Sequence, residues 1–256
     1  MTSTSHPIGP GGPAPGPASF LGRGIPRPVG EFRWVYLWGL PLRAMHWIAV
    51  VSILVLVVTG FYIGAPYFVQ GGEASSHYLM GRMRFFHFAA AGVFVATAIV
   101  RAYWLVAGNQ FERWRALFPL FKQDWVHMWQ QTKFYLMIQP EKAPHYLGHN
   151  PIQQLSYTGL YLVAATQVVT GFAMYGQSRP GGLWYRLFGW VVPLLGGIQM
   201  VHVVHHVFTW VFLIFLPVHL YLALRADILE RSGTISSIIS GGRFVRSDVD
   251  YVDQPK

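Results

Sequence analysis

The chain contains no cysteine among its 256 residues. This absence excludes disulfide bonds, thiolate metal sites, iron–sulfur clusters and the Cys-x-x-Cys-His attachment of c-type haem. Charged residues are also scarce, at 11%, whereas hydrophobic residues make up 53% and aromatic residues 16%. Because a soluble globular domain has roughly 25% charged residues, this composition indicates a protein of the lipid bilayer.

The chain contains several long apolar runs. Runs of about 20 mostly apolar residues predict spanning helices, and four are found, at residues 44–68, 85–107, 153–175 and 200–224. A fifth apolar stretch, 188–197, is too short to span and contains Pro193, so we expect an interfacial segment. The sequence therefore predicts an all-α integral membrane protein, a bundle of four transmembrane helices.

The polar remainder sets the domain organisation. Residues 1–40 begin with a Pro- and Gly-rich stretch that has no apolar core of signal-peptide length, and we expect a disordered cytoplasmic tail. The membrane domain is predicted at 41–228, and a cytoplasmic C-terminal tail at 229–256. Lys and Arg gather before the first span, between the second and third, and after the fourth. Both termini are therefore expected in the cytoplasm, and the net charge of +9 needs no nucleic-acid partner.

The fourth span contains four histidines, His202, His205, His206 and His219. Ionisable groups at membrane depth are costly and are functional by default. On an α-helix, the 14-residue separation of His205 and His219 places them about 40° apart in direction and about 21 Å apart in height. They share one side of the helix at opposite depths.

Two further histidines match these depths. His46 lies at the start of the first span, which enters from the cytoplasm, so it lies at the depth of His219. His87 lies at the start of the second span, which enters from outside, so it lies at the depth of His205. Two pairs are predicted, His46 with His219 on the cytoplasmic side and His87 with His205 on the outer side.

Two neighbours compete with His205 for its role. His202 lies about 60° and His206 about 100° from it around the helix, and only His205 shares a side with His219. His202 is kept open as a residue that supports a ligand or lies where electrons enter, whereas His206 is interpreted as structural.

A pair of neutral imidazoles on facing helices suits six-coordinate haem b, although zinc, nickel and copper also bind imidazole. All ten Asp and Glu residues fall outside the predicted spans, so a cation pathway would have no embedded counter-charge. Arg101, 14 residues after His87, could pair with a haem propionate, and snorkelling to the interface explains it equally well. Further propionate candidates are Arg43, Arg84 and Arg225.

Five stretches together resemble one known family. They are "LRAMHWIAVVSILVLVVTGFYIG", "GRMRFFHFAAAGVF", "RAYWLVAGNQFER", "GHNPIQQLSYTGLYL" and "VHVVHHVFTWVFLIFLPVHLYLALRADI", between residues 42 and 228. This combination resembles the cytochrome b subunit of membrane-bound NiFe-hydrogenases and, more distantly, the gamma subunit of respiratory formate dehydrogenases.

The resemblance implies a bacterial inner-membrane bundle that holds two b haems, with His46, His87, His205 and His219 as ligands. It implies an electron-transfer subunit of a hydrogen:quinone oxidoreductase that has no hydrogenase active site of its own. The partners would be the large subunit and the iron–sulfur small subunit of a periplasmic hydrogenase. In the formate dehydrogenase relatives, an Asn before the third span contacts quinone, which suggests Asn150 with Gln153 here. Asn150 and Pro151 also have the pattern of a helix N-terminus, and the two interpretations are compatible, with His149 a possible proton donor.

Alternatives remain at this stage. The chain could be the cytochrome subunit of a formate dehydrogenase or thiosulfate reductase, a histidine-based metal-ion or proton transporter, or a structural anchor with vestigial histidines. A weak internal echo also stands out, since "VVTGF" occurs at 57–61 and at 168–172. The third span has no histidine, so at most one copy of a duplication would have kept a ligand.

Overall fold

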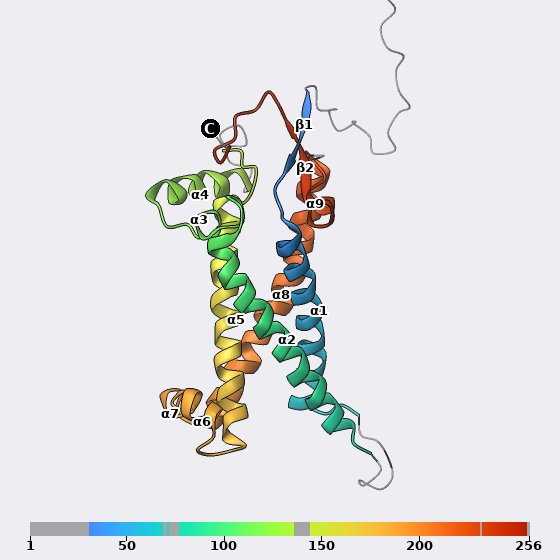
Figure 1. The fold of residues 1–256 in the computed structure, drawn as a ribbon, viewed down its shortest axis with the longest axis vertical. Coiled ribbons are helices and arrows are strands. Elements are labelled where there is room, and N and C mark those ends of the chain that lie inside the picture. The colour runs from blue at the N-terminus through green and yellow to red at the C-terminus, as the bar shows by residue number, and fades with distance from the viewer. Residues whose placement is uncertain (1–30, 69–70, 72–76, 136–143, 231, 255–256) are drawn as a thin grey trace, which may run out of the picture.

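The computed structural model describes residues 31–68, 71, 77–135, 144–230 and 232–254 of the chain. Most of these residues lie in helices that run along one long axis, and both ends of the described chain lie at the same end of the molecule (Figure 1). We term this the sheet end, because it carries a small sheet. The opposite end carries two short helices, α6 (Leu183–Phe188) and α7 (Val191–Leu194), and is termed the α6 end.

Four helices are long and apolar enough to cross a membrane, as predicted: α1 (Leu40–Gly64), α2 (Leu79–Ala107), α5 (Pro151–Gln177) and α8 (Ile198–Glu230). The first begins four residues earlier than expected, with Pro41 in its first turn, where a proline fits without loss of a hydrogen bond. It ends at Gly64 and not at residue 68 because Pro66 cannot continue a helix and restricts the residue before it.

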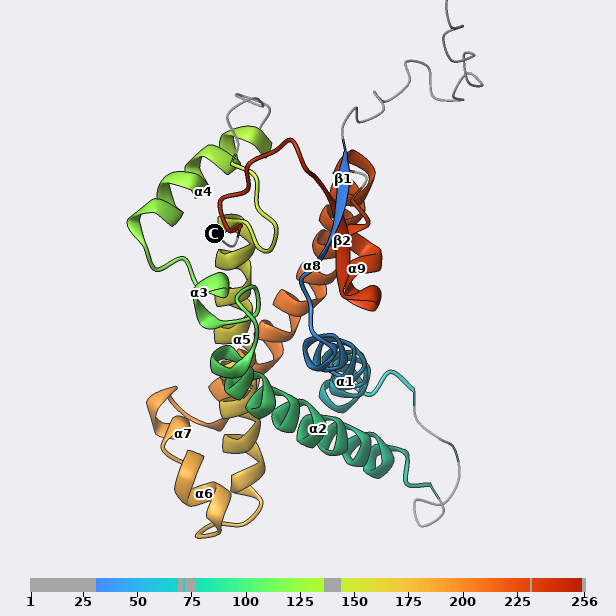
Figure 2. The same ribbon diagram turned by 45° about the horizontal axis from the view of Figure 1, so that its top comes forward.

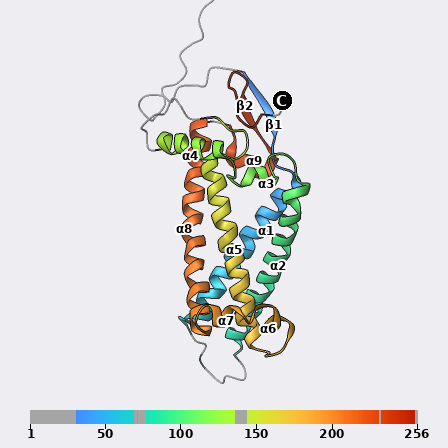
Figure 3. The same ribbon diagram turned by 90° about the vertical axis from the view of Figure 1, so that its left-hand side faces the viewer.

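The four long helices form two packed pairs. Helix α1 lies along α2, and α5 lies along α8 (Figures 2 and 3). Within the second pair, Gln167 Nε2 of α5 donates a hydrogen bond of 2.9 Å to Thr209 Oγ1 of α8. We term α1 with α2 the first half and α5 with α8 the second half.

Side-chain contacts join the two halves. Phe61 of α1 packs edge-on against Trp210 of α8, with ring centroids 5.3 Å apart. Phe88 of α2 packs edge-on against Tyr175 of α5, with centroids 5.2 Å apart. The halves therefore meet through a few large rings and a hydrogen bond from Arg101 of α2 to Tyr161 of α5.

The α6 end is closed by the segment between α5 and α8. Helices α6 and α7 turn back against α5 and the start of α8, where Ala173, Val191 and Val201 form a buried apolar cluster. Phe172 of α5 stacks on Trp184 at a centroid distance of 4.4 Å. The prediction that residues 188–197 do not span is confirmed, since the segment holds only short helices and turns.

The sheet end contains structure where tails were expected. Strand β1 (Phe32–Tyr36) pairs antiparallel with β2 (Gly242–Arg246), so part of the predicted tails 1–40 and 229–256 is ordered and the chain is not purely α-helical. Main-chain pairing between distant segments stabilises these strands, and neither forms one alone. Three short helices complete this end: α3 (Trp114–Leu117), α4 (Lys122–Tyr135) and α9 (Thr234–Ser240).

A buried carboxylate fastens the sheet end to the membrane helices. Glu112 is only 1% exposed. Its Oε1 accepts a hydrogen bond from the Gly39 amide, and its Oε2 accepts from Trp104 Nε1 at 2.8 Å and from the Asn109 amide at 3.2 Å. Gly39 caps the start of α1, and Trp104 lies in the last turn of α2. One side chain thus joins the sheet ends of α1 and α2, while its backbone carbonyl accepts two hydrogen bonds from Arg101.

Candidate functional site

Two histidines come together at the sheet end of the bundle. His46 lies two turns into α1 and His219 lies about two thirds of the way along α8. Their imidazoles are within electrostatic range of each other. The His46 ring packs edge-on against Trp47, and the His219 ring stacks on Phe215 with centroids 5.2 Å apart. Both histidines are half-buried.

A second pair lies toward the α6 end. His87 of α2 and His205 of α8 are also half-buried and within electrostatic range of each other. The two rings are held alike: His87 Nδ1 lies 2.9 Å from Thr59 Oγ1 of α1, and His205 Nδ1 lies 2.8 Å from Thr170 Oγ1 of α5. In each predicted pair the two imidazoles are thus within electrostatic range, and their sharing of one haem stays a prediction.

The competing histidines of α8 have other surroundings. His202 is exposed, and its Nδ1 bonds back to the carbonyl of Ile198 at 2.9 Å, within its own helix. His206 is exposed as well and packs against Phe61 of α1 at 5.1 Å. These positions support the choice of His205 as the paired residue and agree with a structural role for His206.

The donor set matches haem more closely than a bare metal ion. Over the described residues, no three His, Cys, Asp or Glu side chains gather as a metal site would require. A haem iron needs only two axial ligands from the protein because the porphyrin supplies four nitrogens. Glycines also leave room at the rings, since a Cβ on Gly60 would lie 3.2 Å from His87 Cε1 and one on Gly171 would lie 3.4 Å from His205 Cε1. The residues present fit b-type haem.

Arg101, predicted as a propionate partner, lies on α2 toward the sheet end. Its Nε donates to Tyr161 Oη of α5 at 3.1 Å, and its two terminal nitrogens donate to the backbone carbonyl of Glu112. These bonds use three of the five guanidinium N–H groups. Of the further candidates, Arg43 donates to the backbone carbonyl of Ile239.

The two residues predicted to contact quinone form the N-terminal cap of α5. Asn150 Oδ1 accepts from the Gln153 amide, and Gln153 Oε1 accepts from the Asn150 amide, each at 3.0 Å. This reciprocal arrangement is a capping box. The helix-cap interpretation is therefore correct, and it leaves the Gln153 amide nitrogen outside the box.

His149 directly precedes this cap. Its ring lies between Trp38 and Tyr157, with centroid distances of 4.7 and 4.8 Å, and its Nδ1 is buried without a hydrogen-bond partner among the described residues. Burial, assisted by the charges of Arg101 and Arg243, lowers the pKa of His149 to about 3. The imidazole is therefore neutral at physiological pH.

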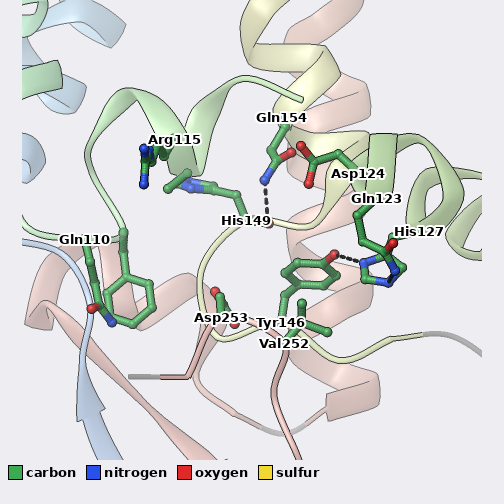
Figure 4. Close-up of a pocket in the computed structure, with 12 residues that line it drawn as sticks. Gln110, Arg115, Gln123, Asp124, His127, Tyr146, His149, Gln154, Val252 and Asp253 are labelled. Carbon is green, nitrogen blue, oxygen red and sulfur yellow. Dashed lines mark hydrogen bonds between the residues drawn. The ribbon is translucent and has the colours of Figure 1, made fainter. Parts of the chain in front are cut away.

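A cavity of about 290 Å³ opens beside His149 at the sheet end (Figure 4). Asp253 closes one side, where its carboxylate accepts hydrogen bonds from the amides of Leu147 and Gly148 at 2.6 and 2.7 Å. Tyr146 Oη bonds His127 Nδ1 at 2.6 Å, and burial raises the pKa of Tyr146 well above its usual range. The cavity is lined by Gln110, Phe111, Arg115, Ala116, Gln123, Asp124, His127, Tyr146, His149, Gln154, Val252 and Asp253.

Three residues of this arrangement were not singled out from the sequence. Thr59 and Thr170 hold the rings of the α6-end pair, and Glu112 ties two helix ends together. The available signal for the threonines was the repeated "VVTGF", whose third residue is the threonine in both copies. For Glu112 the sequence carries no comparable signal, because its partners lie up to 73 residues away.

Comparison with known proteins places the chain in a family. Residues 37–241 match the family model of prokaryotic cytochrome b561. The chain belongs to this family. Membership implies b-type haem, in agreement with the donor set, and the four apolar helices make this cytochrome a multi-pass membrane protein.

Relatives of this cytochrome carry a more specific name. One from Azotobacter vinelandii, 43% identical over 84% of this chain and 90% of its own length, is named "Probable Ni/Fe-hydrogenase B-type cytochrome subunit". One from Cupriavidus necator with the same name is 39% identical over 81% of this chain and 86% of its own length. A third, from Escherichia coli K12, bears the name for hydrogenase 1 and is 33% identical over 81% and 90%. The predicted resemblance is confirmed.

Proposed function

We propose that this cytochrome is the dihaem electron-transfer subunit of a hydrogenase complex. It would receive electrons from the iron–sulfur clusters of the small subunit of a periplasmic NiFe-hydrogenase and pass them to membrane quinone. The observation that carries the proposal is the pairing of His46 with His219 and of His87 with His205 at two levels of one bundle. The names of the relatives support the hydrogenase as partner.

The chain's residues hold and insulate the two centres. Each bound haem supplies a one-electron couple. His46 with His219 and His87 with His205 would hold one haem each, and electron transfer is the reaction this donor set suits. Arg101 has two N–H groups beyond its three bonds and is positioned to pair with a propionate at the sheet end.

The orientation follows from charge. The positively charged segments lie at the sheet end, which we place in the cytoplasm. The pair His87 and His205 then lies on the periplasmic side, near the hydrogenase, and the pair His46 and His219 lies on the cytoplasmic side. Exposed His202 is in position to face the electron donor.

The quinone site is proposed at the N-terminus of α5, on the cytoplasmic side. A quinone carbonyl accepts hydrogen bonds, and the amide groups of Asn150 and Gln153 can donate them. His149 has a buried ring nitrogen nearby and could relay a proton. The adjoining cavity, whose lining side chains are drawn in Figure 4, would give protons a polar route from the cytoplasm.

Haem content tests the electron-transfer proposal. We expect the purified protein to show a reduced-minus-oxidised spectrum of b haem and, by pyridine haemochrome, two haems per chain. His46→Ala or His219→Ala should remove one of them, and His87→Ala or His205→Ala the other, while His206→Ala should keep both. A colourless protein from a haem-replete host would overturn the proposal in favour of a transporter. Co-purification with a hydrogenase distinguishes this function from that of a formate dehydrogenase or thiosulfate reductase subunit.

The quinone site is tested by separating hydrogen bonding from helix capping. Asn150→Asp keeps an oxygen that caps the helix but removes the amide donor, whereas Asn150→Ala removes both. We expect Asn150→Asp to raise the KM for quinone with haem content and thermal stability unchanged. An unchanged KM in Asn150→Asp, with a loss of stability in Asn150→Ala, would leave the residue with its capping role alone.

A further inference from the structure

The two copies of "VVTGF" have equivalent places in the bundle. The first, at 57–61, lies in α1 and faces His87 of α2, and the second, at 168–172, lies in α5 and faces His205 of α8. Each half of the bundle thus presents its copy to a histidine on its other helix. Thr59 and Thr170, the third residues of the copies, are both buried.

The hydrogen bonds of the two threonines define their direction. Thr59 Oγ1 lies 2.6 Å from the carbonyl of Val55, and Thr170 Oγ1 lies 2.6 Å from the carbonyl of Thr166. A hydroxyl has a single hydrogen, and a carbonyl can only accept. Each threonine therefore donates to its own helix backbone, so its oxygen must accept when it bonds an imidazole.

The imidazole hydrogen is fixed by the same reasoning. Since Thr59 Oγ1 accepts, Nδ1 of His87 must carry the hydrogen, and the same holds for His205 with Thr170. In a neutral imidazole the other nitrogen, Nε2, is then unprotonated and has a lone pair for a metal.

The glycine after each threonine allows the ring to approach. Gly60 and Gly171 present no side chain toward Cε1 of the two rings, where a Cβ would come within 3.2 and 3.4 Å. Threonine and glycine together hold each ring against the neighbouring helix by one edge.

We propose that Thr59 and Thr170 are positioning residues that hold His87 and His205 in the Nδ1–H tautomer and direct both Nε2 atoms to one haem iron. This inference rests on the proposed haem ligation. Hydrogen bonds of this kind orient metal-bound histidines and make them more basic ligands, and their loss costs roughly 10–100-fold in metal affinity.

The other pair lacks this device. Over the described residues, neither His46 nor His219 has a recorded hydrogen bond from its ring, and both rings are oriented by aromatic neighbours. The two haems are therefore held by different means. A change at Thr59 or Thr170 should affect one haem and spare the other.

The test uses substitutions that keep shape and remove the hydroxyl. Thr59→Val and Thr170→Val delete the hydroxyl acceptor with little change in volume, whereas Thr59→Ser and Thr170→Ser keep it. The backbone acceptors of the two rings, at Leu56 and Gln167, remain in every variant. Matched controls are Thr97→Val in α2 and Thr166→Val in α5, because the hydroxyls of these half-buried threonines bond only the carbonyls of their own helix among the described residues. The measurements are redox titration of both haems, pyridine haemochrome and the ferric low-spin electron paramagnetic resonance spectrum.

We expect each Val variant at Thr59 or Thr170 to alter one haem only. A less basic imidazole stabilises ferric iron less, so the potential of that haem should rise. A tenfold change in the ratio of ferric to ferrous affinity corresponds to about 59 mV for one electron. Partial loss of that haem, with the second retained and with recovery in the Ser variants, also supports the inference.

Other outcomes overturn it. Unchanged potentials and spectra in Thr59→Val and Thr170→Val would show that the threonines only pack. Equal loss of both haems in the Val and Ser variants would also show that the threonines only pack. The Ser variants retain the hydroxyl, so a loss in them cannot come from a missing hydrogen bond. If the wild-type protein contains no haem, the proposed function itself is refuted. If the wild type contains haem and the Val variants match it, only the role of the threonines is refuted.

Discussion

Replacing Glu112 by Gln tests whether the buried carboxylate fastens the sheet end. The carboxylate accepts three hydrogen bonds, one at Oε1 and two at Oε2. The glutamine side chain keeps one oxygen. If that oxygen takes the Oε2 position and accepts from Trp104 and Asn109, the side-chain NH₂ group must face the backbone amide of Gly39. At least one charge-assisted hydrogen bond is lost and a buried donor is left without an acceptor, at a cost of about 2–4 kcal/mol.

The loss of stability in Glu112→Gln can be measured as a shift of the thermal unfolding midpoint. For a chain of this length, each 1 kcal/mol lowers the midpoint by about 2–4 °C, so Glu112→Gln should unfold roughly 5–15 °C earlier in detergent. Tryptophan fluorescence is a suitable probe because Trp104 donates to this carboxylate. Glu112→Ala should unfold earlier still, since it removes all three acceptor contacts.

Asp248→Asn is the matched control, because Asp248 pairs with Arg246 on the exposed surface of the sheet end. We expect no measurable shift from it. The reasoning is refuted if Glu112→Gln unfolds at the wild-type temperature, or if Asp248→Asn loses as much stability.

Three further predictions follow from the packing and charge of the chain. Gly176→Ala should destabilise the α6 end by about 1–3 kcal/mol, measured by thermal unfolding. The reason is that the alanine Cβ would lie 2.8 Å from the backbone nitrogen of Tyr185. Gly159→Ala, with nothing within 4 Å, should instead gain up to about 1 kcal/mol. The pKa of His149 is about 3 when folded and 6.5 ordinarily, so below pH 6.5 the unfolded chain binds the proton first. The free energy of unfolding should therefore fall by about 1.4 kcal/mol for each pH unit as the pH is lowered from 6.5 toward 3. It should fall less steeply in His149→Gln.

Each of these expectations has a contrary result. Equal unfolding temperatures for Gly176→Ala and wild type would mean that α6 does not pack on α5 as described. A loss of stability in Gly159→Ala would mean that this face of α5 is covered by a partner. Identical acid profiles for wild type and His149→Gln would mean that the imidazole is already solvated and protonates freely.

The elements predicted from the sequence are those set by local pattern. Hydropathy located the four membrane helices because a spanning helix needs about 20 apolar residues. Helical periodicity paired His205 with the level of His87, and His219 with the level of His46, because the rise and turn of a helix are nearly constant. Both results depend on near neighbours in the chain.

What the sequence did not predict depends on distant contacts. The strand Phe32–Tyr36 pairs with Gly242–Arg246, and five-residue segments give too weak a pattern to find each other. The second hydrogen bond of Thr59 was also unpredictable, because a threonine inside a helix ordinarily bonds only its own backbone. The repeated "VVTGF" indicated a possible duplication and not which side chains its threonine contacts.

The division of the bundle into two halves has a consequence for assembly. On the proposed ligation, each iron would join an imidazole of the first half to one of the second, since His46 and His87 belong to α1 and α2 and both partners belong to α8. Haem would then link two helix pairs that otherwise meet through a few rings, a hydrogen bond from Arg101 to Tyr161 and the paired strands at the sheet end, and its binding energy would become folding energy. Haem supply would in this way decide whether the subunit matures, before any electron crosses it.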